Sequence, residues 1–135
     1  MGAVATVAMS VPMLLARRLR IIDRQPPEEI TDRVLDEADL PTRGSRLRML
    51  TAWNHLWFGA LAGIVFVTLR GASPSVARFR ALGPAYGLTI WFAAYRLVLP
   101  RVGLIRRESQ AGRARDAVML VAHLVYGLVL ERLTR

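Results

Sequence analysis

Residues 49–69 read MLTAWNHLWFGALAGIVFVTL and contain no charged side chain. An α-helix rises about 1.5 Å per residue, so a helix of this length just crosses a hydrocarbon core of roughly 30 Å. Its apolar residues lie on all faces rather than on one stripe, which a helix at a water interface would not need. The stretch therefore predicts a membrane-spanning helix and disfavours the alternative, a soluble four-helix bundle.

Three further charge-free segments flank this stretch, at residues 1–16, 81–95 and 117–130. The third segment can be extended past Arg96, because a long arginine stem can lie along apolar surface while its head reaches the interface. The fourth can end with Glu131 and Arg132 at the far interface. We therefore predict an all-α polytopic membrane protein, a single domain of residues 1–135. Its four transmembrane helices, at about 1–18, 49–69, 81–99 and 116–133, would form two hairpins.

The composition agrees with this class of protein. The chain has 135 residues, 53% of them hydrophobic and 21% charged, and its mean hydropathy is +0.32. All 19 basic residues are arginine, against 10 acidic residues, and there is no cysteine. Disulfide frameworks, thiolate zinc sites and iron–sulfur clusters are thereby excluded.

The arginines are distributed unevenly between the two sides of the predicted bundle. Residues 17–48 contain eight and residues 101–115 contain five, whereas the opposite side holds five. By the positive-inside rule the first and third connections face the cytoplasm, and both termini face the periplasm of a bacterial inner membrane. Arginines follow the first apolar segment instead of preceding it, so we expect a retained helix and not a signal peptide. The net charge of +9 then reflects membrane topology and anionic headgroups, and no nucleic-acid partner is expected.

The long first connection contains a predicted amphipathic helix at about residues 27–38. Pro26 and Pro27 are suited to opening a helix, and Glu28 and Glu29 would lie in its first turn, where the helix dipole favours acids. Pro41 and Gly44 would end it. We expect this helix to lie on the cytoplasmic interface or to cap the bundle; a partner-docking face is the alternative.

A short internal repeat links the second and fourth predicted helices. Asn-His-Leu-Trp-Phe-Gly at 54–59 is echoed by Ala-His-Leu-Val-Tyr-Gly at 122–127. Residues four apart share a helix face, so each histidine lies on the same stripe as a glycine, and His55 and His123 would lie at similar depth. Small residues let membrane helices pack closely. The glycines expected at such contacts are Gly59, Gly63, Gly83, Gly87 and Gly127.

Three roles are open for His55 and His123. The favoured one is structural: a neutral imidazole hydrogen-bonded across a helix interface to Asn54, Thr51, a tyrosine or a backbone carbonyl. Axial ligation of a haem or chlorin cofactor is the second, since the neighbouring glycine could leave room for a flat macrocycle. A proton or small-solute path is the third. We identify no metal-ion site, paired catalytic carboxylates, serine triad or phosphate loop, so an enzyme is not predicted.

The order of these motifs resembles a known family. An apolar start, Pro-Pro-x-x-Ile at 26–30, His-x-x-x-Gly at 55–59, a Gly-rich third helix ending in Pro100 and Gly103, and His-Leu-x-Tyr-Gly at 123–127 are similar to the small YagU-like bacterial inner-membrane proteins. The resemblance implies four membrane helices in the bacterial cytoplasmic membrane. It implies no established activity.

Two classes of function remain. The first is a non-enzymatic accessory, packing or scaffold subunit of a larger membrane complex, with a pigment- or haem-containing, energy-converting assembly as one form. Trp53, Trp57, Trp91 and Arg96 would then face the interface, lipid or partner helices. The alternative is a small channel or carrier for protons or small solutes, functioning as an oligomer, with the two histidines along its path. Lipid and other membrane subunits are the expected partners.

Overall fold

The computed structural model describes residues 1–22, 25–40, 42–72, 75, 78–79, 81–103 and 110–135, and these residues are helical or lie in connections. No strand occurs in these ranges, as the sequence predicts. The helices are α1 (Gly2–Arg18), α2 (Pro26–Glu37), α3 (Gly44–Gly71), α5 (Leu82–Phe92), the π-helix η1 (Ala93–Val98), α6 (Leu99–Arg101) and α7 (Gln110–Leu133).

The ends of α2 and the start of α3 differ slightly from the expected bounds. Two prolines open α2, with Glu28 and Glu29 in its first turn, and the helix ends at Glu37. Pro41 lies outside the described residues. Gly44 does not close the preceding segment but begins α3, five residues before the charge-free stretch, because the arginine and leucine residues in between are good helix formers.

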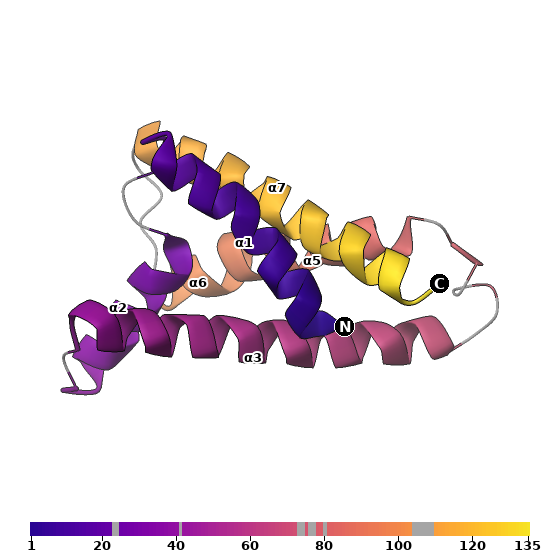
Figure 1. Cartoon of the computed structure of the whole chain (residues 1–135), viewed down its shortest axis with the longest axis horizontal. Helices are drawn as coiled ribbons and strands as arrows, with labels where there is room; N and C mark the ends of the chain where they lie inside the picture. Colours follow the sequence, from indigo (N-terminus) through magenta and orange to yellow (C-terminus); the bar gives the residue numbers. More distant parts are fainter. Residues whose placement is uncertain (23–24, 41, 73–74, 76–77, 80, 104–109) are drawn as a thin grey trace.

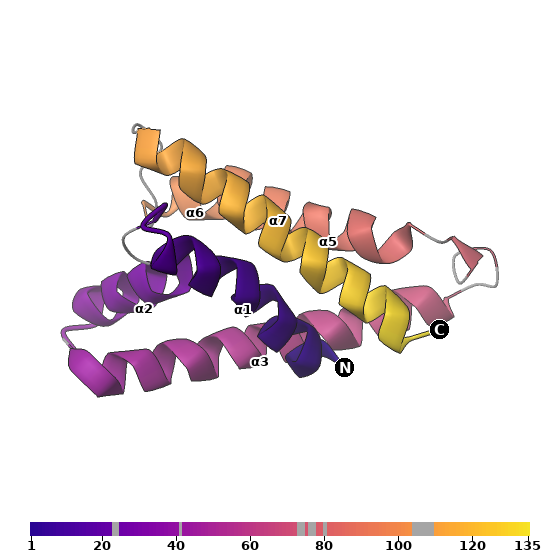
Figure 2. The same ribbon diagram turned by 45° about the horizontal axis from the view of Figure 1, so that its top comes forward.

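α1 and α7 lie beside each other and are inclined to α3, from which they diverge toward the end of the bundle where α2 lies (Figures 1 and 2). α3 and α7 run in one direction, and α1 and the continuous segment α5–η1–α6 run in the opposite one. The C-terminus lies near the end of the bundle where α3 ends and α5 begins, and α2 lies at the other end (Figure 1). The N-terminus lies beside the middle of α3, where Gly2 packs against Gly59 and Gly63. The connection before α3 and the end of α6 therefore share one end of the molecule.

The core lies where α1 and α5 pack against α7. α1 also contacts α3, and α2 packs on α3. The buried side chains come from four helices, so no single hairpin contains the core. Those with less than 2% exposure include Met13, Phe66, Met119 and Leu130.

The glycines lie where helix backbones meet. A Cβ atom on Gly63 would be 2.5 Å from the Cα of Gly2, and one on Gly127 would be 2.6 Å from the carbonyl carbon of Gly83. A Cβ on Gly87 would collide with the carbonyl oxygen of His123. These distances are far below ordinary van der Waals contact, so only glycine permits these helix pairs to approach so closely.

Only α3, among the helices in the described ranges, is both long and apolar enough to cross a bilayer. It has 28 residues, and its most apolar window has a mean hydropathy of 1.4 and is 22% buried. α1 has 17 residues, and α5 has 11 before the winding changes to that of a π-helix. α7 has 24 residues but carries charged side chains near both ends. Length and composition therefore support one membrane span, and the topology of four spans stays a prediction.

Candidate functional site

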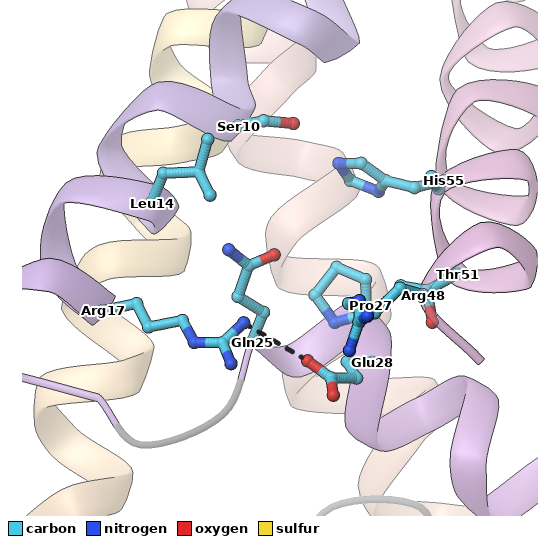
Figure 3. A pocket seen from close by; sticks show the side chains of 10 residues that line it. Ser10, Leu14, Arg17, Gln25, Pro27, Glu28, Arg48, Thr51 and His55 are labelled. Atoms are coloured by element: carbon cyan, nitrogen blue, oxygen red, sulfur yellow. Dashed lines mark ion pairs between the residues drawn. The ribbon is translucent and has the colours of Figure 1, made fainter. Parts of the chain in front are cut away.

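A cavity of about 230 Å³ lies between α1, α2 and α3, at the end of the bundle where α2 lies (Figure 3). The sequence patterns did not predict it, because it depends on how α2 folds back beside α3. Each of the three helices, together with the residue that precedes α2, contributes side chains to it. Its lining consists of Ser10, Leu14, Arg17, Gln25, Pro27, Glu28, Arg48, Thr51, Ala52 and His55.

Two polar side chains of α3 reach this cavity. Thr51 and His55 are one turn apart and so lie on the same face of the helix. The imidazole of His55 points from α3 toward α1, where Ser10 and Leu14 lie (Figure 3). Thr51 is only 9% exposed. Thr51 Oγ1 and His55 Nε2 are buried, and neither has a hydrogen-bond partner among the described residues.

Such unpartnered atoms are unusual. Leaving a buried donor or acceptor unsatisfied costs about 1–3 kcal/mol, and most buried polar groups are bound by protein or water. Among the described residues, His55 Nε2 lacks the hydrogen bond expected across a helix interface. The cavity in front of the ring instead offers room for a water molecule or a ligand group.

Charged side chains flank the cavity. Arg17 of α1 and Glu28 of α2 form an ion pair at 3.7 Å (Figure 3). Arg48 of α3 also lines the wall. Two guanidinium groups against one carboxylate leave the lining with one excess positive charge.

His123 has a different environment. It is 8% exposed, and its Nδ1–H donates to the carbonyl oxygen of Met119 at 2.8 Å. Its ring lies edge-on to that of Tyr95, with 5.8 Å between the centroids. The hydrogen-bond partner of His123 is therefore a carbonyl one turn earlier in α7 and not a group on another helix. This hydrogen bond places the proton on Nδ1 and so fixes the tautomer of the ring.

The two copies of the repeat meet through a tyrosine. The hydroxyl of Tyr126 donates to the carbonyl oxygen of Gly59 at 2.6 Å, and that of Tyr86 donates to the carbonyl oxygen of Ala62 at 2.7 Å. The space beside Gly59 is occupied by Thr6, whose Cβ would lie 2.9 Å from an added Cβ. The glycines thus leave no gap of the kind that motivated the haem or chlorin hypothesis.

The aromatic and basic residues expected at the lipid interface fall into two groups. Trp53 and Trp57 are 67% and 57% exposed on α3. Trp91 packs against the core instead. Arg96 forms an ion pair with Asp116 of α7 at 3.0 Å, and its guanidinium lies 5.1 Å from the centre of the Trp91 ring. Arg96 is therefore held against α7, because an acidic partner lies within reach.

Glu131 lies at the opposite end of the bundle, and its burial was not predicted from the sequence. Glu131 is 3% exposed and accepts hydrogen bonds from the backbone N–H of Gly83 at 2.7 Å and from Arg70 at 2.9 Å. Arg135 adds a longer contact at 3.4 Å. These donors satisfy the carboxylate where it is buried. The cluster joins α3, the start of α5 and the end of α7.

A second charged cluster fixes α2. Glu29 accepts hydrogen bonds from Arg115 of α7 at 2.7 Å and from Arg33 of α2 at 3.1 Å. α2 is thus held across the end of the bundle by packing on α3 and by a charged contact with α7. This contact helps to hold α2, which supplies one wall of the cavity, in its place.

Comparison with known proteins identifies the family of the chain. Residues 1–134 match the family model described as "Family of unknown function (DUF6789)". The chain belongs to the DUF6789 family. No curated protein and no solved structure match it. The resemblance to the YagU-like proteins is not tested by these findings and stays a prediction.

Proposed function

We propose that this DUF6789 protein crosses a bacterial inner membrane four times and acts as a non-enzymatic packing subunit of a larger membrane assembly. The observation that carries the proposal is the outer face of α3. This is the helix long and apolar enough to cross a bilayer, and only 22% of its most apolar window is buried by the rest of the chain. Large side chains project from that face, including Trp53, Trp57 and Phe58, at 67%, 57% and 70% exposure.

The apolar exterior of α1 supports a location in the membrane for the other helices. Val4, Val7 and Val11 are 52–61% exposed, and Leu14 and Leu15 are just over half exposed. Apolar surface of this extent is rare on monomeric soluble proteins and marks a membrane or protein contact. The segment α5–η1–α6 continues without a break from Leu82 to Arg101. That length is close to the roughly 20 residues that a crossing requires.

The arrangement of the helices supports the proposed orientation. The connection from α1 to α3 and the end of α6 lie at one end of the bundle, and the C-terminus lies at the other (Figure 1). The two arginine-rich connections can therefore face the same compartment, as the positive-inside rule requires. α2 would then lie at the cytoplasmic surface.

The interior of the bundle supports a packing role. Its glycines bring helix backbones together, and Tyr86 and Tyr126 donate their hydroxyl groups to backbone carbonyls of α3. Membrane helices associate through close packing and interhelical hydrogen bonds rather than through a hydrophobic force. The small residues are used inside this chain, and the large aromatic residues of α3 are left for an external partner.

A photo-crosslinking amino acid placed at Trp57 tests the partner. After irradiation of native membranes, we expect one cross-linked product of defined mass that contains a second protein. The matched control is the same substitution at Val11, which is exposed to a similar degree on α1. Only lipid adducts from position 57, or the same ladder of proteins from both positions, would refute a specific partner on α3.

A pair of carboxyl-terminal reporter fusions tests the topology separately. A reporter active only in the periplasm should be active when it follows Arg135, and one active only in the cytoplasm should be silent. The reverse pattern would overturn the proposed orientation without bearing on the partner.

A further inference from the structure

We propose that the cavity between α1, α2 and α3 binds the phosphate group of a small, singly charged phosphate ester, with Thr51, His55 and Arg17 as the contacting residues. The headgroup of an anionic phospholipid is the source that the surroundings favour. This choice of source rests on the proposed membrane location; the anion site itself does not.

The unpartnered atoms define the hydrogen-bonding character of the ligand. Thr51 Oγ1 and His55 Nε2 are buried, lack partners among the described residues, and lie one turn apart on α3. A hydroxyl group and a neutral imidazole protonated at Nε2 can both donate a hydrogen bond. A group with several acceptor oxygens in one place satisfies both donors at once, as phosphate does.

The charges of the lining define the charge of the ligand. Arg17 and Arg48 face one carboxylate, Glu28, so a single negative charge balances the cavity. The Arg17–Glu28 pair is 3.7 Å long, whereas a direct charge-assisted hydrogen bond measures about 2.7–2.9 Å. Arg17 is 48% exposed, so its side chain has freedom to turn toward a ligand. A guanidinium fork matches the oxygens of a phosphate group.

The size and walls of the cavity define how much of the ligand enters. A volume of about 230 Å³ is below the roughly 300–1,000 Å³ of sites that enclose drug-sized ligands. Only a headgroup or a free phosphate therefore fits. Leu14 and Ala52 line the cavity and are themselves exposed, so the lining continues onto the apolar exteriors of α1 and α3. The acyl chains of a lipid would lie along these exteriors.

Binding to the purified full-length protein tests the site. The probes are phosphatidylglycerol and phosphatidylcholine in mixed micelles and, separately, inorganic phosphate. Affinity is measured by titration calorimetry, and retained lipid by native mass spectrometry. We expect preferential binding of phosphatidylglycerol, with Thr51→Val weakening it about tenfold, as the loss of one hydrogen bond to a charged group predicts. Thr68→Val makes the same chemical change on an exposed part of α3 and should leave binding unchanged.

The variants are chosen to remain folded. The hydroxyl group of Thr51 has no partner in the described residues, so valine removes no hydrogen bond of the fold. If Thr51→Val nevertheless fails to fold, Arg17→Gln at its half-exposed position provides the second test, with the same expected loss. In another outcome, these variants weaken the binding of inorganic phosphate, but the protein does not prefer phosphatidylglycerol. This result would support the anion site and would identify its ligand as a soluble phosphate ester.

Two results would overturn the proposal. The first is equal retention of phosphatidylglycerol and phosphatidylcholine together with no response to phosphate. The second is an identical effect of Thr51→Val and Thr68→Val. Neither result depends on cross-linking at Trp57, so the anion site and the partner on α3 can fail independently.

Discussion

The contact between Gly83 and Gly127 offers the most direct test of how this bundle is held together. Gly83 lies on α5 and Gly127 lies on α7, and a side chain on either residue would collide with the backbone of the other helix. In Gly127→Ala, the new Cβ would lie 2.6 Å from the carbonyl carbon of Gly83 and 3.0 Å from the nitrogen of Pro84, and closer still to the carbonyl oxygen of Gly83. All three atoms belong to the backbone, so no side chain can rotate away.

The expected cost follows from two opposing effects. An ordinary contact begins at about 3.4 Å, so α5 and α7 must separate by roughly 1 Å, and overpacking of this kind costs about 1–3 kcal/mol. Because a helix backbone yields less than a side chain, we take the upper end, about 3 kcal/mol. Replacing a helical glycine by alanine returns up to about 1 kcal/mol through backbone entropy. The net destabilisation is therefore about 2 kcal/mol.

Denaturant titration in detergent, followed by circular dichroism, measures this difference. The matched control is Gly71→Ala at the end of α3, where no atom lies within 4 Å of the added Cβ. The control should be neutral or slightly stabilising. Equal free energies of unfolding for the two variants would show that α5 and α7 do not pack through this glycine pair.

Three further predictions concern polar contacts. Glu131→Gln should cost about 3 kcal/mol in the same denaturant titration, because it leaves the largely buried guanidinium of Arg70 without its ionic partner, and an unchanged free energy of unfolding would contradict this. Tyr126→Phe should cost about 1 kcal/mol in the same denaturant titration, since it removes the hydrogen bond to Gly59, and an unaltered midpoint would refute that contribution. Arg115→Gln should speed limited proteolysis within α2, because the contact with Glu29 is lost, whereas an unchanged cleavage rate would show that packing on α3 suffices.

The sequence predicts where the helices lie in the chain better than it predicts which helices contact one another. The charge-free stretch at 49–69 identifies α3, and the two prolines followed by two glutamates identify α2, because both signals are local. The π-helical winding at Ala93–Val98 has no comparable local signal. It places Tyr95 against His123 and Arg96 beside Asp116, and such contacts depend on the neighbouring helix.

The candidate site shows the same limit. The stripe of His55 and Gly59 could be predicted from spacing. The cavity in front of His55 also requires Gln25, which precedes α2, and Pro27 and Glu28 of α2, a helix that the sequence places only near the interface. Glu131 was expected at an interface, and its burial follows from Arg70, which lies 61 positions earlier in the chain. Pairings across such separations are not visible in one sequence.

The contact of α1 with α7 has a consequence for how the protein is made. α1 packs against α7, which is synthesised after it, and Glu29 can bind Arg115 only once a further 86 residues have been added. Until then the α1–α3 pair exposes the side chains that α7 will cover, among them Met9 and Met13. A newly made chain therefore passes through a stage in which the surface of α1 that α7 will cover is still open. A chain that stops before α7 should lose the core, because α1 and α5 both pack against that helix.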